Sequence, residues 1–138
     1  MTKQEKVVDT EMGQLTTVAY TYEGDEEDKN KLYMINEVQY PTGTFPEDSL
    51  LLMTDYLEAA IETAARAITG ELLYAHRLDT DDYVGFLFRI KYNEGKAVMK
   101  GYSILHNDVF YMVKAYAHTD DSLNDDMNIY LESFTPRN

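Results

Sequence analysis

The pattern of apolar and polar positions divides the first forty residues into three extended segments. Residues 4–22 predict a hairpin, because an extended run to Thr10 is followed by a turn near Gly13 and by a second arm, 15–22, that is rich in Thr, Val and Tyr. A charged stretch without periodicity, 23–30, predicts a solvated loop. A third strand is predicted over 32–40, where Pro41 stops it.

The next segment has the period of an α-helix. Pro46, two acidic residues and Ser49 precede a run in which apolar residues recur every three or four positions, and Gly70 follows the run. This pattern predicts one long amphipathic helix whose apolar stripe packs on a sheet rather than forming a ligand site. The stripe consists of Met53, Leu57, Ala60, Ile61, Ala64 and Ile68.

The remainder of the chain predicts four more strands and a short helix. Connections of only a few residues join the strands, so neighbouring strands must be antiparallel. The last strand is apolar on both of its alternating faces, and we expect both faces to be covered. After this strand, a short helix is predicted at about 123–131, because Asp and Ser residues stand at the position of its amino-terminal cap and further Asp residues follow near that end. The four strands are predicted over 72–78, 83–92, 97–105 and 109–117.

This order of elements predicts an α+β fold. We expect a three-layer sandwich, in which a central antiparallel sheet of about six to seven strands carries the long helix on one face. The short carboxyl-terminal helix would lie on the other face or at the edge. A length of 138 residues, 44% of them hydrophobic, predicts a single domain over 1–138 with one core.

Composition excludes several classes of partner and chemistry. The net charge of −13 would repel the phosphates of nucleic acids and an anionic membrane surface. The absence of cysteine excludes disulfides, thiolate nucleophiles, zinc–thiolate sites and iron–sulfur ligation. No apolar run approaches the roughly 20 residues that span a bilayer, so no membrane insertion is expected.

The candidates for nucleophilic catalysis are weak. Ser103 lies in Gly101–Leu105, which begins like the nucleophile elbow of hydrolases but lacks its closing glycine and falls inside a predicted strand. The spacing is compatible with a triad that uses Ser103 with His106 or His118, but both histidines are expected at the surface or at strand edges. We therefore assign no catalytic residue and expect a protein that is not an enzyme.

Metal and cofactor sites are also not predicted. The three histidines, His76, His106 and His118, are far apart in sequence, which argues against zinc. The acidic groups at 79–82 and 120–126 are open to weak calcium binding, but they lack the glycine and distal glutamate of a calcium loop. Turns and helix caps use the same residues. No glycine-rich phosphate loop is present, so no cofactor is expected.

Two local signatures resemble those of a known family. The first runs from Gly70 through Arg77-Leu78-Asp79 to Tyr83-Val84-Gly85 and Arg89, and the second is Tyr130-Leu131-Glu132-Ser133-Phe134, preceded by Tyr111 on the last predicted strand. Both are similar to motifs of the PsbP-like superfamily, named for an extrinsic protein of the photosynthetic oxygen-evolving complex, and especially to its small uncharacterised bacterial members. The chain departs from the pattern at Asp82, where relatives commonly have Gly, and at Tyr130, where they commonly have Phe.

The resemblance implies a role without chemistry. PsbP-like proteins act by binding to assemblies, so the leading hypothesis is a non-enzymatic interaction or accessory domain whose partner is a protein. The alternative is a small-molecule binder or hydrolase that uses a Tyr-lined pocket between the sheet and the long helix. Kinship also implies an extracytoplasmic location, periplasmic or envelope-associated, although the amino-terminal residues here contain no export signal.

Overall fold

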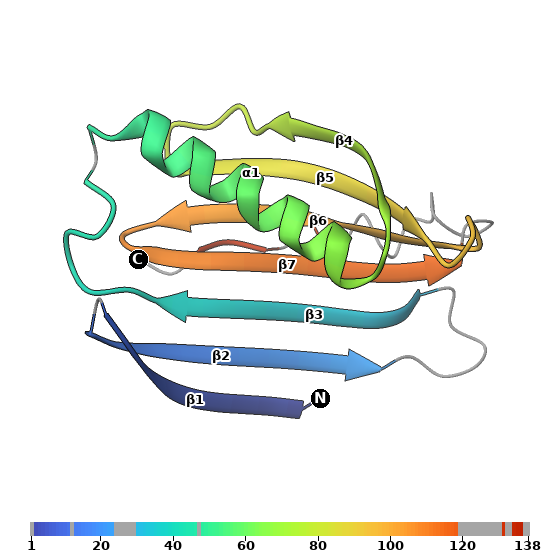
Figure 1. Ribbon diagram of the computed structural model, residues 1–138, viewed down its shortest axis with the longest axis horizontal. Helices are drawn as coiled ribbons and strands as arrows, with labels where there is room; N and C mark the ends of the chain where they lie inside the picture. Colours follow the sequence, from blue (N-terminus) through green and yellow to red (C-terminus); the bar gives the residue numbers. More distant parts are fainter. Residues whose placement is uncertain are drawn as a thin grey trace.

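A computed structural model describes residues 2–11, 13–23, 30–46, 48–118, 131 and 134–136. These residues form one antiparallel sheet of seven strands, in the order β1-β2-β3-β7-β6-β5-β4, and one helix that lies on a face of the sheet (Figure 1). The elements are β1 (Thr2–Thr10), β2 (Gly13–Glu23), β3 (Asn30–Gln39), α1 (Leu50–Ala67), β4 (Glu71–Arg77), β5 (Val84–Tyr92), β6 (Ala97–His106) and β7 (Val109–His118).

The helix α1 packs through the stripe that its sequence predicts. Met53, Leu57, Ile61 and Ala65 are buried against large apolar side chains of the sheet, among them Phe88 and Ile90 of β5. In Figure 1, α1 lies over the part of the sheet formed by β4, β5 and β6, and it leaves β1, β2 and β3 uncovered. Within the described residues, no helix has the length and apolar character needed to cross a membrane.

The end of α1 is a Schellman motif in which the left-handed residue is not a glycine. Thr69 has a φ of 51°, and the amide groups of Thr69 and Gly70 donate hydrogen bonds to the carbonyls of Arg66 and Ala65. Gly70 is needed for a different reason, because a Cβ there would lie 2.6 Å from the side chain of Ile90. The predicted end of the helix is therefore correct in position, but Thr69 adopts the conformation that Gly70 was expected to supply.

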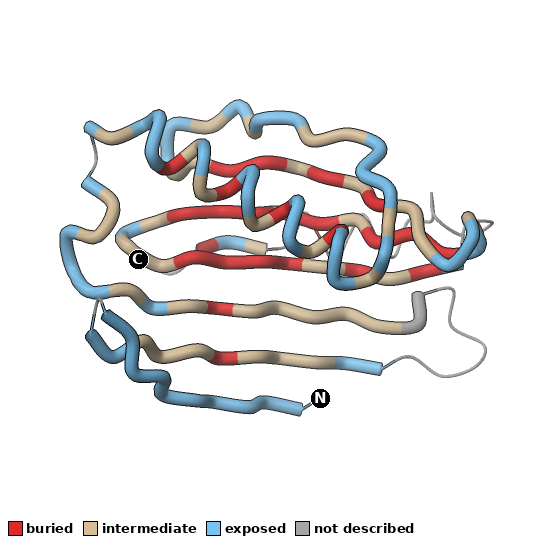
Figure 2. The backbone as a smooth tube through the Cα atoms, in the orientation of Figure 1, coloured by how far each residue is buried: buried red, intermediate tan, exposed pale blue. Residues whose placement is uncertain are grey.

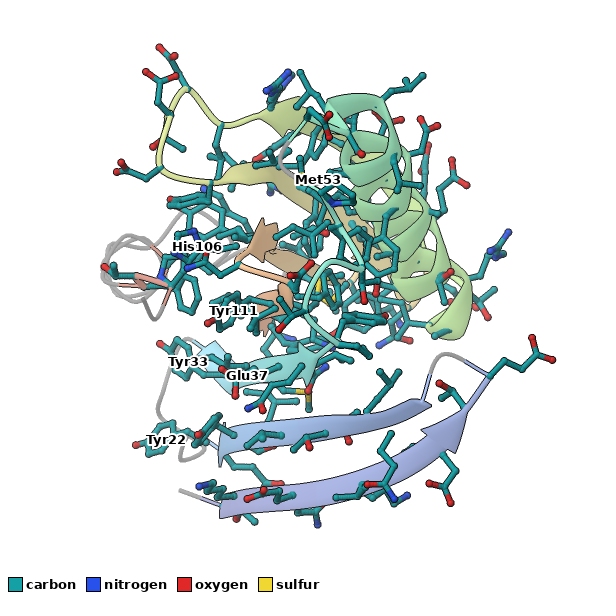
Figure 3. All side chains as sticks on the ribbon, turned by 90° about the vertical axis from the view of Figure 1, so that its left-hand side faces the viewer. Tyr22, Tyr33, Glu37, Met53, His106 and Tyr111 are labelled. Atoms are coloured by element: carbon teal, nitrogen blue, oxygen red, sulfur yellow. The ribbon has the colours of Figure 1, made fainter. Side chains whose placement is uncertain are left out.

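The sheet is buried on both faces only in its centre. Phe110 and Met112 of β7 pack toward α1, whereas Tyr111 and Val113 pack on the opposite face, where Leu131 also lies. Figure 3 shows Tyr111, together with Tyr33 and Tyr22, on the side of the sheet away from α1. The central strand β7 is therefore covered on both sides, as its sequence indicates.

The predicted fold class was wrong. Instead of a three-layer α+β sandwich with two helices, the described chain is dominated by its seven-stranded sheet and has one helix. The predicted short helix at 123–131 lies outside the described residues, apart from Leu131. A physical reason for the dominance of the sheet is the direction of α1. The helix runs roughly along the strands (Figure 1), and its width of about 10 Å covers only a few strands spaced about 4.8 Å apart.

Candidate functional site

The uncovered half of the sheet forms a groove with α1. Strand β1 is exposed along its whole length and β2 has one buried residue, Val18, whereas buried residues concentrate in β5, β6 and β7 (Figure 2). In the side view, the β1–β2 hairpin extends beneath the same side of the sheet as α1 (Figure 3). The space between them is a groove of about 950 Å³ that is open to solvent.

Two cross-strand rows of side chains, together with Lys114 from a third row, face α1 across the floor of the groove. Strand register places one side chain from each of β7, β3, β2 and β1 in every row, and the ring of Phe110, 5.3 Å from that of Tyr56, shows that the rows face α1. The floor is apolar near α1 and becomes polar toward β1. The first two rows are Phe110-Val38-Thr17-Lys6 and Met112-Asn36-Ala19-Gln4, and Lys114 begins the third row, Lys114-Met34-Thr21-Thr2.

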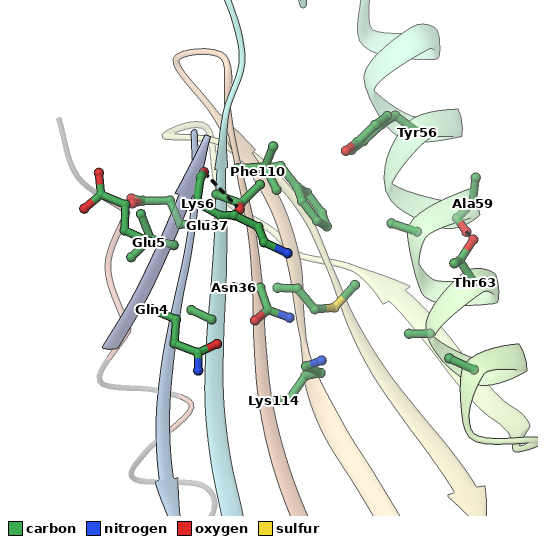
Figure 4. Close-up of a pocket in the computed structure, with 18 residues that line it drawn as sticks. Gln4, Glu5, Lys6, Asn36, Glu37, Tyr56, Ala59, Thr63, Phe110 and Lys114 are labelled. Atoms are coloured by element: carbon green, nitrogen blue, oxygen red, sulfur yellow. Dashed lines mark hydrogen bonds between the residues drawn. The ribbon is translucent and has the colours of Figure 1, made fainter. Parts of the chain in front are cut away.

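The wall opposite β1 is a strip of small residues on α1. Ala59, Thr63 and Ala67 recur every four positions, with Ala60 and Ala64 beside them (Figure 4). This strip lies next to the buried stripe of Leu57 and Ile61 and is partly exposed because no other element packs on it in the described structure. Side chains this small leave the helix backbone accessible to another apolar surface.

A cluster of four aromatic rings closes one end of the groove. Tyr56 of α1 contacts Phe45, Phe110 and Tyr40 edge to face, and its hydroxyl makes a short hydrogen bond with that of Tyr40. Burial, and to a lesser extent this hydrogen bond, raises the pKa of Tyr56 well above that of a free tyrosine. Tyr56 is therefore neutral at physiological pH and provides an apolar end wall.

Lys114 provides a cation in the floor of the groove. It lies on the central strand β7 and is half-buried, and burial lowers its pKa. Its ammonium group lies 5.9 Å from the ring centroid of Tyr116, and no carboxylate of the described residues lies within ion-pair distance. Figure 4 shows Lys114 and Asn36 facing Ala59 and Thr63 across the groove.

The structure separates the residues considered for nucleophilic catalysis. Ser103 is completely buried, and its hydroxyl donates a hydrogen bond of 3.2 Å to the carbonyl of Leu57, so it links β6 to α1. His106 lies three residues along β6 on the other face of the sheet, with its Nδ1 3.0 Å from the carbonyl oxygen of Asp82. His118 is six residues beyond Met112, the partner of Ser103, which places it about 20 Å away. No triad is assembled from these residues.

The candidate metal ligands also do not converge. His76 stacks on Tyr74 at the β4 edge, 4.9 Å between ring centroids. In the acidic turn at 79–82, the amide of Asp82 donates to the Thr80 hydroxyl, which is a turn interaction. The described part of the chain contains no group of three or more His, Asp or Glu side chains that could hold a metal ion. The acidic segment 120–126 lies outside the described residues.

Two features of the sequence indicate the groove: a row of small residues on α1 and a lysine in the apolar strand β7. Ala60 and Ala64 pack against the core, as predicted, and also line the groove, and small residues at a spacing of four continue through Ala59, Thr63 and Ala67, beyond the core face. The second signal is Lys114, because it is the one lysine in a strand that otherwise consists of apolar residues, Tyr and His. The groove lies between the sheet and α1, where a Tyr-lined pocket was considered, but Tyr56 is the one tyrosine among its described lining residues.

Comparisons with known proteins identify the fold but no family. No family model matches the chain, and no curated protein matches it. A crystal structure of a protein of unknown function from Pseudomonas aeruginosa, for which a regulatory role has been suggested, is similar with a TM-score of 0.63. The similarity covers 97% of this chain and 98% of that one, at 11% sequence identity. The two proteins therefore share a fold, and the similarity is restricted to the fold.

Proposed function

We propose that the protein is a non-enzymatic binding domain and that the groove between α1 and β1–β3 holds an amphipathic segment of another protein. The observation that carries the proposal is the open groove, with an apolar floor beside α1 and a polar outer part. From Tyr56 to Ala67 the wall is about 16 Å long, which matches three turns of a bound helix. Grooves of this kind accept the apolar face of an amphipathic segment.

The site lacks the features that an acyl-transfer enzyme needs. The Ser103 hydroxyl is directed into the protein and donates to a helix carbonyl, so no base and no substrate reach it. The groove residues that the structure describes include neither Ser nor His. A binding role therefore accounts for the groove better than the hydrolase considered from the sequence.

A small apolar molecule is the second candidate for the occupant. The volume of about 950 Å³ falls at the upper end of the range for small-molecule sites. We favour the protein segment because small-molecule sites usually enclose most of their ligand, whereas this groove is open to solvent and its outer wall is an exposed hairpin.

Kinship with PsbP-like proteins and an extracytoplasmic location remain proposals. The resemblance supports a binding role because members of that family act through association. The regulatory role suggested for the Pseudomonas aeruginosa protein is compatible with binding, and at 11% identity it is an analogy between folds. Fractionation of the source cells would test the location.

The binding role is tested with a substitution that fills the groove. Ala59 is exposed and lines the groove, so Ala59→Trp blocks it without disturbing the core, while Glu62→Trp places the same side chain on a part of α1 outside the groove. The probe is a fluorescein-labelled amphipathic peptide of 18 Leu, Ala and Ser residues, followed by fluorescence anisotropy. We expect Ala59→Trp to weaken binding by about ten-fold or more, about 1.4 kcal/mol, and Glu62→Trp to leave it unchanged.

Two results would change this conclusion. A fluorescent long-chain fatty acid that binds in place of the peptide, and that Ala59→Trp excludes, would favour the small-molecule alternative. Absence of binding by either probe, or binding that Ala59→Trp does not affect, would refute the groove as the binding site.

A further inference from the structure

Lys114 is not explained by the fold of the free protein. A half-buried cation on a central strand loses hydration, and the neighbouring described residues supply an aromatic ring but no carboxylate to compensate. The adjacent positions of the same face of β7 are Met112 and Tyr116, so an apolar side chain would fit the pattern of the strand. Groups that reduce stability without a structural partner are typical of binding sites.

The charged side chains that line the groove and lie in the rows facing α1 are of one sign. Lys114 and Lys6 lie in the rows that face α1, and Figure 4 shows Lys6 reaching from β1 over the floor. Glu37 and Glu5 also line the groove, but they belong to the row of Tyr111, whose side chain packs on the face away from α1. The lining residues of α1 are apolar or Thr, apart from Tyr56. In a chain with a net charge of −13, the groove-lining residues of the rows that face α1 therefore carry positive charge.

We propose that the protein segment bound in the groove carries an acidic side chain within its apolar face, and that this carboxylate pairs with Lys114. This inference rests on the binding role proposed above and specifies the partner. When a segment occupies the groove, water is excluded from around Lys114 by the segment, by Met112 and Met34 and by the α1 wall. This exclusion strengthens an ion pair at Lys114. Lys6, at the exposed outer edge, would attract the same negative charge more weakly.

The test compares two peptides that differ in one side chain. Both have the 18-residue Leu, Ala and Ser sequence used above, with either Glu or Gln at the centre of the apolar face. Wild-type protein is expected to bind the Glu peptide about ten-fold more tightly than the Gln peptide in fluorescence anisotropy. Lys114→Met is expected to remove this preference and Lys114→Arg to keep most of it, because Arg retains the charge. Lys96→Met, in the exposed β5–β6 turn, is the matched control and should behave as wild type.

The outcomes separate this inference from the binding role. If the Glu and Gln peptides bind equally and Ala59→Trp weakens both, the groove binds peptides but the acidic partner is wrong. A preference for Glu that persists in Lys114→Met would also overturn the role of Lys114. If neither peptide binds, the proposed function fails and this inference fails with it. A melting temperature of Lys114→Met at or above that of wild type would show that lost preference is not caused by unfolding.

Discussion

Replacing Gly101 by Ala tests how closely the central strands approach one another. A Cβ at this position would lie 2.0 Å from the carbonyl oxygen of Val113, whereas a carbon and a carbonyl oxygen in ordinary contact are about 3.3 Å apart. About 1.3 Å of displacement is required, and the atom that must move belongs to β7, which is paired on both sides by β3 and β6.

Overpacking of a core typically costs about 1 to 3 kcal/mol, and the cost here should reach or exceed the upper end because the clash is with backbone. We expect Gly101→Ala to lower the free energy of unfolding by about 3 kcal/mol, measured by urea unfolding, and to lower the melting temperature by roughly 10 °C. Gly43→Ala is the control, since Gly43 has a φ of 89° and no heavy atom within 4 Å of the added methyl group, which limits its cost to about 1 to 2 kcal/mol. If Gly101→Ala is no more destabilising than Gly43→Ala, the argument from close approach is wrong.

Three further changes have defined outcomes. Phe134→Ala should reduce the free energy of unfolding by about 2 kcal/mol, because the ring of Phe134 is half-buried against Tyr111 and a fully buried Phe would contribute more. An unchanged thermal melt would contradict this packing role. Thr69→Gly should raise stability by roughly 1 kcal/mol in urea unfolding by relieving the left-handed backbone, and a loss of stability would refute it. Burial, with a smaller effect of nearby Tyr92, raises the pKa of Tyr116 to about 12, whereas the unfolded chain has a tyrosine pKa of about 10. The stability that this difference provides is fully present below about pH 10 and should be lost as the pH rises to about 12. Melting temperatures from pH 8 to 12 should show a smaller loss in Tyr116→Phe than in wild type.

The elements with strong periodicity were predictable from the sequence. The spacing of Met53, Leu57 and Ile61 identifies the buried face of α1, because a helix that packs on a sheet must present an apolar side chain every three or four residues. The double apolar face of β7 likewise indicates a strand covered on both sides. These local rules involve one element and one layer, and they hold without knowledge of the rest of the molecule.

The extent of the layers and the groove could not be predicted in the same way. Ala60 and Ala64 pack against the core and also line the groove, because α1 covers only part of the seven strands, which is a property of the assembled sheet. Ser103 was a candidate nucleophile in sequence because its burial and its bond to Leu57 arise from residues 46 positions apart. Lys114 was not recognised because the strand period assigns it to the α1 face but does not show what lies above it.

The exposed β1–β2 hairpin has a consequence for how rigid the molecule is. Its strands are held by backbone hydrogen bonds to each other and to β3, while the large buried side chains lie on α1 and β5–β7. Few buried apolar contacts and many solvent-exposed backbone bonds are the properties of segments that open at low free energy while the core stays folded. The two walls of the groove therefore differ in stiffness. Because the core holds the α1 wall, we expect the hairpin wall to open at lower free energy than the α1 wall, so that the width of the groove would adapt to the proposed segment.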